Sequence, residues 1–180
     1  VKSEKNVSEE TSLEPLTDYS KYKVECEKVL FKYQSSNFTT ATIRPATVCG
    51  YSPRQRLDLV VNILTNLAYH KRQITIFGGQ QLRPNIHIDD MVDAYLLFLE
   101  CEESKIAGKV FNVGYENHTV IQLGEDVKSV IGKDVKLILS QTDDNRSYHI
   151  SSDKIKQELG FVPKKNIKDA VKDLVDAFEK

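Results

Sequence analysis

The sequence contains only three cysteines, and their number and spacing argue against a disulfide-stabilised domain and against a zinc-binding domain. Cys26, Cys49 and Cys101 are odd in number and lie far apart. They therefore fit neither a disulfide framework nor the closely spaced pairs of a zinc site, and the four histidines do not cluster with them. We expect no metal site, and we expect reduced thiols in a cytoplasmic protein.

An excess of charge and a long apolar run are also lacking. Lysine plus arginine number 25 and aspartate plus glutamate 26, which leaves a formal net charge of −1. A chain without a basic excess does not attract a phosphate backbone, so nucleic acid is not expected as a partner. The longest apolar run, at residues 95–99, is far too short to cross a bilayer, so no membrane partner is expected either.

The front of the chain shows half of an α/β repeat. Apolar spacing predicts a helix over residues 18–34, capped by Thr17 or Asp18, with an apolar stripe along one face. The β-branched segment 38–43 then predicts a buried strand. Residues 1–17 contain no strand that could pair with it, so we expect the chain to begin in the middle of a sheet domain.

The rest of the chain alternates between short strands and amphipathic helices. We expect a loop at residues 46–56 and helices at residues 57–69, 91–99, 120 or 121 to 131, 151–159 and 167–178. Strands are expected at residues 73–77, 85–88, 109–114 and 135–139. Asp89 or Asp90 is expected to cap the second of these helices, and Asn166 the last. His87 is expected to be a packed or capping residue and not a catalytic one.

Two residues on the first predicted helix indicate chemistry. Tyr19 and Lys23 are four positions apart, so their side chains share one helix face. A nearby ammonium favours the phenolate form of a tyrosine, which can then act as a general base or acid near neutral pH. The alternative is a solvated helix face on which the pair is incidental.

Five segments follow one another in a recognisable order. They are Tyr19-x-x-x-Lys23 with Glu27, the strand and loop at 42–50, the arginine-led segment 83–90, Phe111-Asn112-Val113-Gly114, and Leu159-Gly160-Phe161-x-Pro163. Together they resemble the extended short-chain dehydrogenase/reductases, which are the NAD-dependent nucleotide-sugar epimerases and dehydratases. The resemblance covers nearly the whole chain and favours the catalytic interpretation of the tyrosine and the lysine.

The resemblance implies an α/β fold and a hydride chemistry. A partial Rossmann-like parallel sheet would occupy residues 1–57, and a small α/β substrate-binding domain residues 58–180. In the family the tyrosine removes a proton from a sugar hydroxyl, NAD or NADP takes the hydride, and the lysine holds the nicotinamide ribose. Tyr19 and Lys23 match these positions, and Pro45 matches the point where the backbone passes the nicotinamide.

The same resemblance implies a nucleotide-diphosphate sugar as substrate. Arginine can clamp a diphosphate with paired hydrogen bonds, and Arg83 is the first candidate and Arg146 the second. Thr75 and Phe77 match the strand that lines the nucleobase pocket, and Thr47 stands where the family often has a substrate-contacting asparagine. The alternatives are an ordinary surface position for Arg146 and a core position for Phe77.

One part of the family pattern is lacking. None of the 8 glycines forms the G-x-x-G-x-x-G or G-x-G-x-x-G turn that binds a dinucleotide. We therefore expect this chain to be the carboxy-terminal portion of an NAD(P)-dependent 4-epimerase or 4,6-dehydratase, with the epimerase favoured. The chain alone is expected to be inactive. It would form a homodimer or join a missing amino-terminal half. The alternatives are an inactive nucleotide-sugar binding module or remnant, and a pure interaction domain.

Overall fold

The computed structural model describes residues 6–143 and 147–180, and it confirms the expected α/β class. The helices are α1 (Asp18–Lys32), α2 (Val60–Lys71), α3 (Ile88–Glu100), α4 (Glu103–Ile106), α5 (Val120–Ile131), α6 (Asp153–Leu159) and α7 (Ile167–Phe178). The strands are β1 (Ala41–Pro45), β2 (Thr47–Cys49), β3 (Gln73–Phe77), β4 (Leu82–His87), β5 (Lys109–Val113), β6 (Glu116–Thr119) and β7 (Lys136–Ser140).

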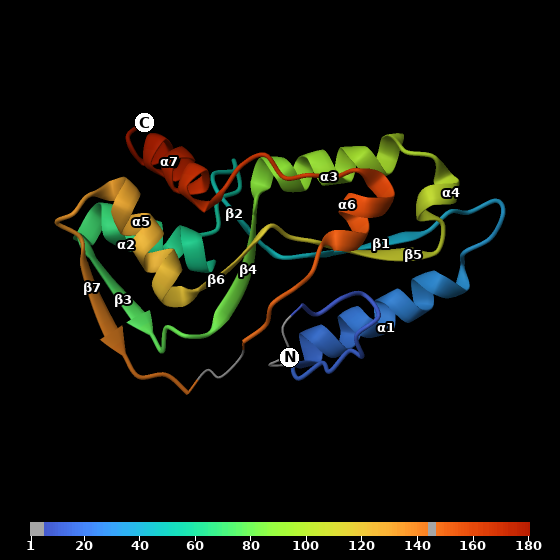
Figure 1. Cartoon of the computed structure of the whole chain (residues 1–180), viewed down its shortest axis with the longest axis horizontal. Helices are drawn as coiled ribbons and strands as arrows, with labels where there is room; N and C mark the ends of the chain where they lie inside the picture. The colour runs from blue at the N-terminus through green and yellow to red at the C-terminus, as the bar shows by residue number, and fades with distance from the viewer. Residues whose placement is uncertain (1–5, 144–146) are drawn as a thin grey trace.

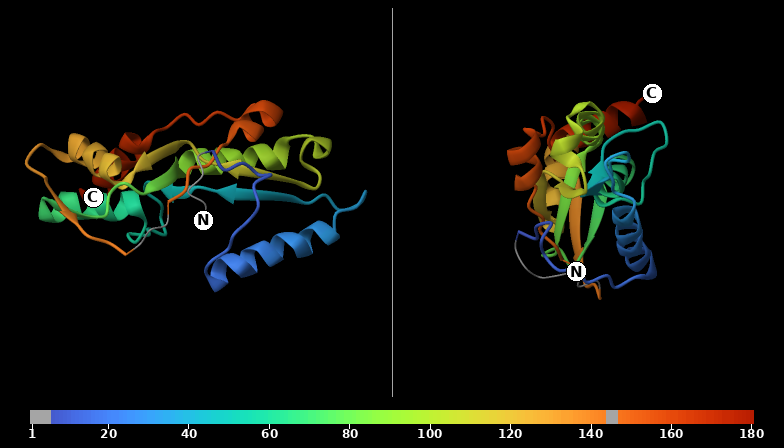
Figure 2. Two further views of the ribbon diagram at one scale, coloured as in Figure 1. Left: turned by 60° about the horizontal axis from the view of Figure 1, so that its bottom comes forward. Right: turned by 90° about the vertical axis from the view of Figure 1, so that its right-hand side faces the viewer.

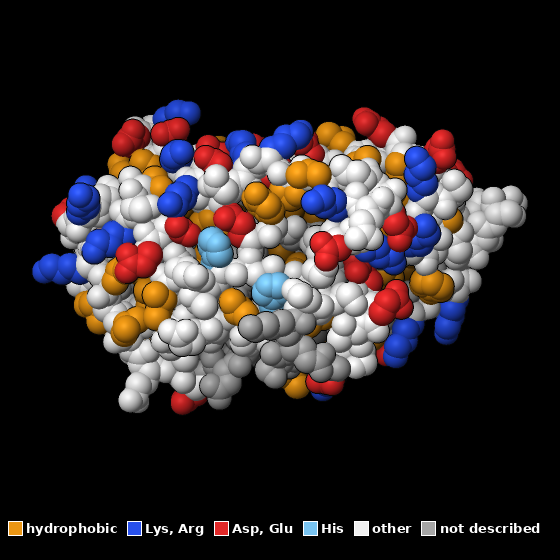
Figure 3. Space-filling model, in the orientation of Figure 1, with side chains coloured by type: hydrophobic (Ala, Val, Ile, Leu, Met, Phe, Trp, Pro, Cys, Tyr) orange, Lys and Arg blue, Asp and Glu red, His pale blue; other side chains and the backbone are white. Residues whose placement is uncertain are grey.

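The strands form small sheets in an elongated molecule with two lobes (Figure 1). In one lobe, α2, α5 and α7 gather beside the parallel pair β3–β7, and in the other, α3 and α6 lie on one side of the parallel pair β1–β5 and α1 on the other. Between the lobes, β4 pairs parallel with β2 and antiparallel with β6. Acidic and basic side chains are interspersed over the face shown in Figure 3.

Each lobe has its own apolar core. The first unites α2, β3, α5 and α7 through buried residues that include Leu64, Ile76, Leu123 and Val171. Gly124 lets α5 approach this core closely, because an added Cβ would lie 2.6 Å from the Ile76 side chain.

The second core is built around β1 and β5. It contains Phe111 of β5, Ile86 of β4, Met91 of α3 and Ile155 of α6. The layer around β1 thus draws helices and strands from the later part of the chain, and the division of the sequence at residue 57 stays a prediction. Within the described residues, no helix combines the length and the apolar composition that a membrane span needs.

Helix α1 leaves most of its apolar stripe uncovered. No residue of α1 is buried, and Tyr22, Val29 and Phe31 are exposed. Figure 2 shows α1 projecting from the body of the molecule. Amphipathic spacing indicates which face of a helix can be buried, but burial requires a neighbouring layer. Among the described residues, no layer covers this face of α1.

Three local predictions are corrected. The first strand runs over Ala41–Pro45 instead of 38–43, with the proline in an edge strand, where a missing N–H is tolerated. The segment 46–56, expected to be a loop, contains β2. His87, and neither Asp89 nor Asp90, caps α3.

Candidate active site

A pocket of about 810 Å³ opens between the start of α1, helix α2 and strands β2, β3 and β4. Its lining contains Tyr19, Thr47, Thr75, Phe77 and Arg83, all of which were predicted to belong to the site. These residues come from different elements, so tertiary packing is what brings them together. The pocket is therefore the candidate active site.

Lys23 and Pro45 are outside this lining, and a third predicted site residue is not described by the structure. Lys23 lies one turn beyond Tyr19 on α1, and Pro45 ends β1 directly before the strand that carries Thr47. Arg146 lies outside the described residues. The functional roles of all three stay predictions.

The first turn of α1 places Tyr19 at the pocket. Thr17 caps the helix, since its hydroxyl accepts a hydrogen bond from the Ser20 N–H at 3.2 Å while the Ser20 hydroxyl accepts one from the Thr17 N–H at 3.1 Å. The Lys23 Nζ atom then lies 5.7 Å from the centroid of the Tyr19 ring. Tyr19 is 74% exposed, so its hydroxyl is accessible to a ligand in the pocket.

A salt bridge connects α1 to the sheet. The Arg44 Nε atom donates to Glu27 Oε1 at 2.9 Å, and Arg44 Nη2 donates to Glu27 Oε2 at 2.6 Å. Arg44 Nη1 also donates to the Glu9 carbonyl oxygen at 3.4 Å. Bidentate pairing of this kind fixes both position and orientation. It therefore helps to hold the helix that carries Tyr19 and Lys23.

Arg83 stands at the wall of the pocket, near the start of β4. Its Nη1 atom donates to the Leu82 carbonyl oxygen at 3.0 Å, and its Cζ atom lies 5.8 Å from the centroid of the Tyr148 ring. Tyr148 also lines the pocket. Sequence reasoning missed this tyrosine, although it lies only two positions beyond Arg146, in the segment where a second arginine was sought.

Strand β3 contributes an exposed aromatic ring to the lining. Phe77 ends β3 and is 58% exposed, which excludes the alternative that it is a core residue. Thr75 lies two positions earlier and is partly buried. An exposed ring beside a strand offers a stacking face and polar backbone groups, which suit a planar ligand such as a nucleobase.

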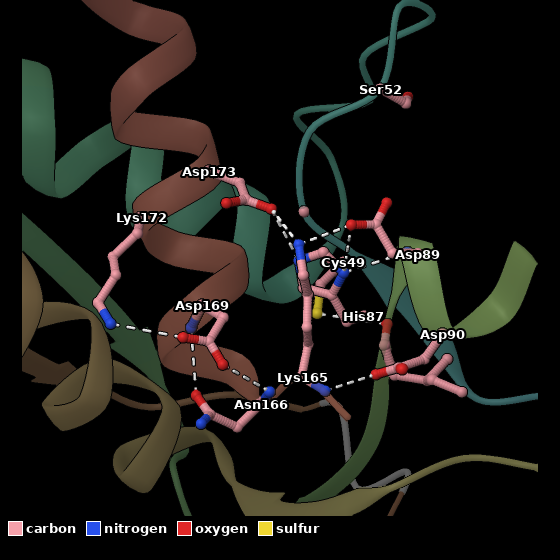
Figure 4. A network of polar contacts seen from close by, with 12 residues as sticks. Cys49, Ser52, His87, Asp89, Asp90, Lys165, Asn166, Asp169, Lys172 and Asp173 are labelled. Carbon is pink, nitrogen blue, oxygen red and sulfur yellow. Dashed lines mark hydrogen bonds and ion pairs between the residues drawn. The ribbon is translucent and has the colours of Figure 1, made fainter. Parts of the chain in front are cut away.

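A second polar network connects α7 to the start of α3 (Figure 4). The His87 ring is buried, with its Nδ1 accepting a hydrogen bond from the Asp89 N–H at 3.1 Å and its Nε2 lying 3.1 Å from Asp173 Oδ2. Lys165 Nζ lies 2.6 Å from Asp89 Oδ2 and 3.2 Å from Asp173 Oδ2. The hydrogen bond from Lys165 lowers the pKa of Asp89.

Among the described residues, this network contains the one cluster of histidine and carboxylate side chains whose potential ligand atoms are close enough together to hold a metal ion. The donor atoms of His87, Asp89 and Asp173 lie within 4.8 Å of one another. The Lys165 ammonium already bridges the two carboxylates, and a cation there would have to displace it. We interpret the network as an ion-paired connection, with His87 as the helix cap.

Comparison with known proteins identifies the family. The model of the NAD dependent epimerase/dehydratase family matches residues 2–114. The chain belongs to the NAD-dependent epimerase/dehydratase family. The resemblance inferred from the five sequence segments is thereby confirmed.

Individual members of the epimerase/dehydratase family are similar over most of the chain. An uncharacterized UDP-glucose epimerase of Bacillus subtilis, YtcB, is 31% identical over 92% of this chain and 52% of its own length. A UDP-glucose 4-epimerase of Thermotoga maritima, solved with UDP-glucose, is 29% identical with a TM-score of 0.79, over 92% of this chain and 54% of that one.

The fold match is closer still for a third family member. A UDP-glucuronic acid 4-epimerase of Bacillus cereus, solved with UDP-glucuronic acid and NAD, has a TM-score of 0.85 at 23% identity, over 99% of this chain and 58% of that one. At that identity the likeness concerns the fold alone. The chain spans about half the length of the curated relatives it matches.

Proposed function

We propose that this chain is the carboxy-terminal, substrate-binding part of an NAD- or NADP-dependent nucleotide-sugar epimerase or dehydratase. The observation that carries the proposal is a single pocket whose lining combines the Tyr19 phenol, the Arg83 guanidinium and the exposed Phe77 ring. A phenol suits proton transfer, a guanidinium suits a diphosphate, and a ring suits a planar base. The 4-epimerase is favoured because similar relatives bear that name.

Each lining residue has a role in the proposal. Arg83 binds the diphosphate, and Arg146 is the second candidate for that contact. Phe77 and Thr75 receive the base, for which uracil is the first choice because related structures contain UDP-sugars. Thr47, on β2, faces the sugar.

Tyr19 is proposed to take the proton from a sugar hydroxyl and to return it after the sugar has been reoriented. Lys23 lies close enough to the ring to stabilise the negative charge on the phenol, at 5.7 Å from its centroid. When bound, the nicotinamide cofactor supplies the acceptor and later the donor of the hydride. The ammonium of Lys23 and the phenol of Tyr19 are suitable partners for ribose hydroxyls, and Pro45 lies at the neighbouring strand end.

The chain alone is proposed to be inactive, because its sequence contains no glycine-rich dinucleotide turn. The remaining cofactor contacts would come from an amino-terminal half. Two features support such a partner: within the described residues β1 pairs only with β5, and α1 leaves its apolar face exposed. A homodimer through α1 is the alternative assembly. A cytoplasmic location belongs to the same proposal, and the three cysteines are free.

The second candidate function is a nucleotide-sugar binding module without catalysis. It is favoured by one observation: Arg83, Phe77 and Thr75 of this chain line the pocket, whereas its sequence contains no glycine-rich dinucleotide turn. Binding of the sugar nucleotide could then persist without any cofactor.

Calorimetric titration of the purified chain with UDP-, GDP-, CDP- and dTDP-sugars, with and without NAD, tests the proposal. We expect a UDP-sugar to bind, and Arg83→Ala to weaken that binding about 10- to 100-fold, as expected for loss of a charge-assisted hydrogen bond. Arg54→Ala is the matched control, since Arg54 is exposed and lies outside the pocket lining.

The outcomes separate the candidates. Binding of no sugar nucleotide contradicts both of them. Binding that NAD leaves unchanged, also after an amino-terminal half has been added, favours the module. Formation of an epimerised product by the isolated chain contradicts the proposed inactivity, and product formed only after addition of that half supports the enzyme.

A further inference from the structure

The segment that follows β7 returns alongside the start of β4. The Leu82 N–H donates to the Ser147 hydroxyl at 3.0 Å, and the Tyr148 N–H donates to the Leu82 carbonyl oxygen at 3.4 Å. These two hydrogen bonds fix Tyr148 beside Arg83, the residue that follows Leu82. The tyrosine is thus held by its backbone at the wall of the pocket.

The side chains of Arg83 and Tyr148 lie against each other. The Cζ atom of the guanidinium lies 5.8 Å from the ring centroid, within the range of a cation–π contact. An aromatic face attracts a guanidinium without consuming any of its five N–H donors. The contact therefore restricts the rotamers of a long, flexible side chain while leaving its hydrogen-bonding capacity unchanged.

We infer that Tyr148 is a positioning residue for diphosphate recognition: its ring holds the Arg83 guanidinium in the orientation that binds a nucleoside diphosphate. The inference rests on the proposed function of the pocket. A side chain held in its binding orientation loses less conformational entropy when the ligand arrives. The benefit should therefore appear in the affinity for the diphosphate group and not in the affinity for the base.

The test compares the affinities of the whole chain for UDP and for uridine, which lacks the diphosphate, by calorimetry and by competition. Tyr148→Ala should weaken UDP binding about 3- to 30-fold, the range of cation–π contacts, and should leave uridine binding unchanged. Tyr148→Phe should retain the affinity of the wild type for both ligands, because it keeps the aromatic face. Tyr148→Leu, which keeps apolar bulk without a ring, should behave like Tyr148→Ala.

A double-mutant cycle isolates the pair. In the Arg83→Ala background, Tyr148→Ala should cause no further loss of UDP affinity. Tyr95→Ala is the matched control, since Tyr95 is exposed on α3 and lies outside the pocket.

Equal losses for UDP and uridine, an undiminished UDP affinity in both Tyr148→Ala and Tyr148→Leu, or a loss in Tyr148→Phe as large as in Tyr148→Ala would each overturn the inference. In all three cases the wild type still binds UDP, so the proposed function stands. Failure of the wild type to bind UDP overturns the proposed uridine-diphosphate site and this inference together.

Discussion

Replacement of Glu27 by alanine measures how firmly α1 is held against the sheet. The Glu27 carboxylate pairs with both Arg44 Nε and Nη2, and the two side chains are 23% and 22% exposed. Loss of one partner from a fully buried pair costs about 3–5 kcal/mol, whereas a fully exposed pair contributes about 0–1 kcal/mol. At this partial burial we expect an intermediate loss of about 1–3 kcal/mol.

The loss should be confined to α1. No residue of α1 is buried, and neither apolar core includes a residue of this helix. A 15-residue helix without packing is only marginally stable in water, so weakening its connection should increase local opening. The amides of α1 should exchange about 5- to 150-fold faster, at about 1.4 kcal/mol per tenfold, while those of α2 should not change.

Hydrogen exchange followed by mass spectrometry on peptides from α1 and α2 gives this comparison. Glu25→Ala is the matched control, because Glu25 pairs with Lys28 at 2.7 Å on the same helix but both side chains are more than half exposed, at 61% and 62%. Its effect on exchange should be small. The reasoning is refuted if Glu27→Ala and Glu25→Ala accelerate exchange equally, or if α2 opens as much as α1.

Three further changes test other parts of the structure. Gly79→Ala should lower the free energy of unfolding by about 2–4 kcal/mol, because Gly79 has φ +111° and an added Cβ would lie 2.6 Å from the Ile121 side chain. A denaturant titration measures this loss, and an unchanged unfolding midpoint contradicts it. A thiol reagent should modify the exposed Cys26 in the native protein, but Cys49 only after unfolding. Burial raises the pKa of the Cys49 thiol to about 12, which keeps it protonated and unreactive. Modification of Cys49 in the native protein contradicts this. Burial also raises the pKa of the Glu116 carboxyl above its value in the unfolded chain. The charged carboxylate therefore lowers the free energy of unfolding at pH values above the native pKa, and this loss is absent below the pKa of the unfolded chain. Glu116→Gln should therefore stabilise the protein relative to wild type more at pH 7 than at pH 4, and an equal difference at both pH values would contradict it.

Local signals were sufficient for several elements. The strand over 73–77 and the helix that ends at Phe178 with Asn166 as its cap were predicted with the observed bounds. Both depend on short-range features, which are the alternation of apolar residues and the hydrogen bond between a capping side chain and the first turn. The family was recognisable for the same reason, since its motifs are contiguous segments.

Elements that depend on distant partners were missed or shifted. Strand β2 exists because Thr47–Cys49 pairs with Asn85–His87, and nothing in a three-residue segment announces that pairing. At the start of α3, residue type favoured Asp89 or Asp90 as the cap, while His87 was expected to be packed or capping. The buried His87 ring caps the helix, so tertiary contacts decided between these candidates. Residue preference is a weak guide where tertiary contacts decide.

The amino-acid sequence by itself determined the order of the longer helices and of five strands, the shared helix face of Tyr19 and Lys23, and the family. Only the tertiary structure decided that Tyr19, Phe77 and Arg83 line one pocket, that Tyr148 lies against the arginine, and that α1 has an uncovered face. The physical reason is range: periodicity and capping act within a few residues, whereas a pocket is made by side chains that chain folding brings together from distant positions.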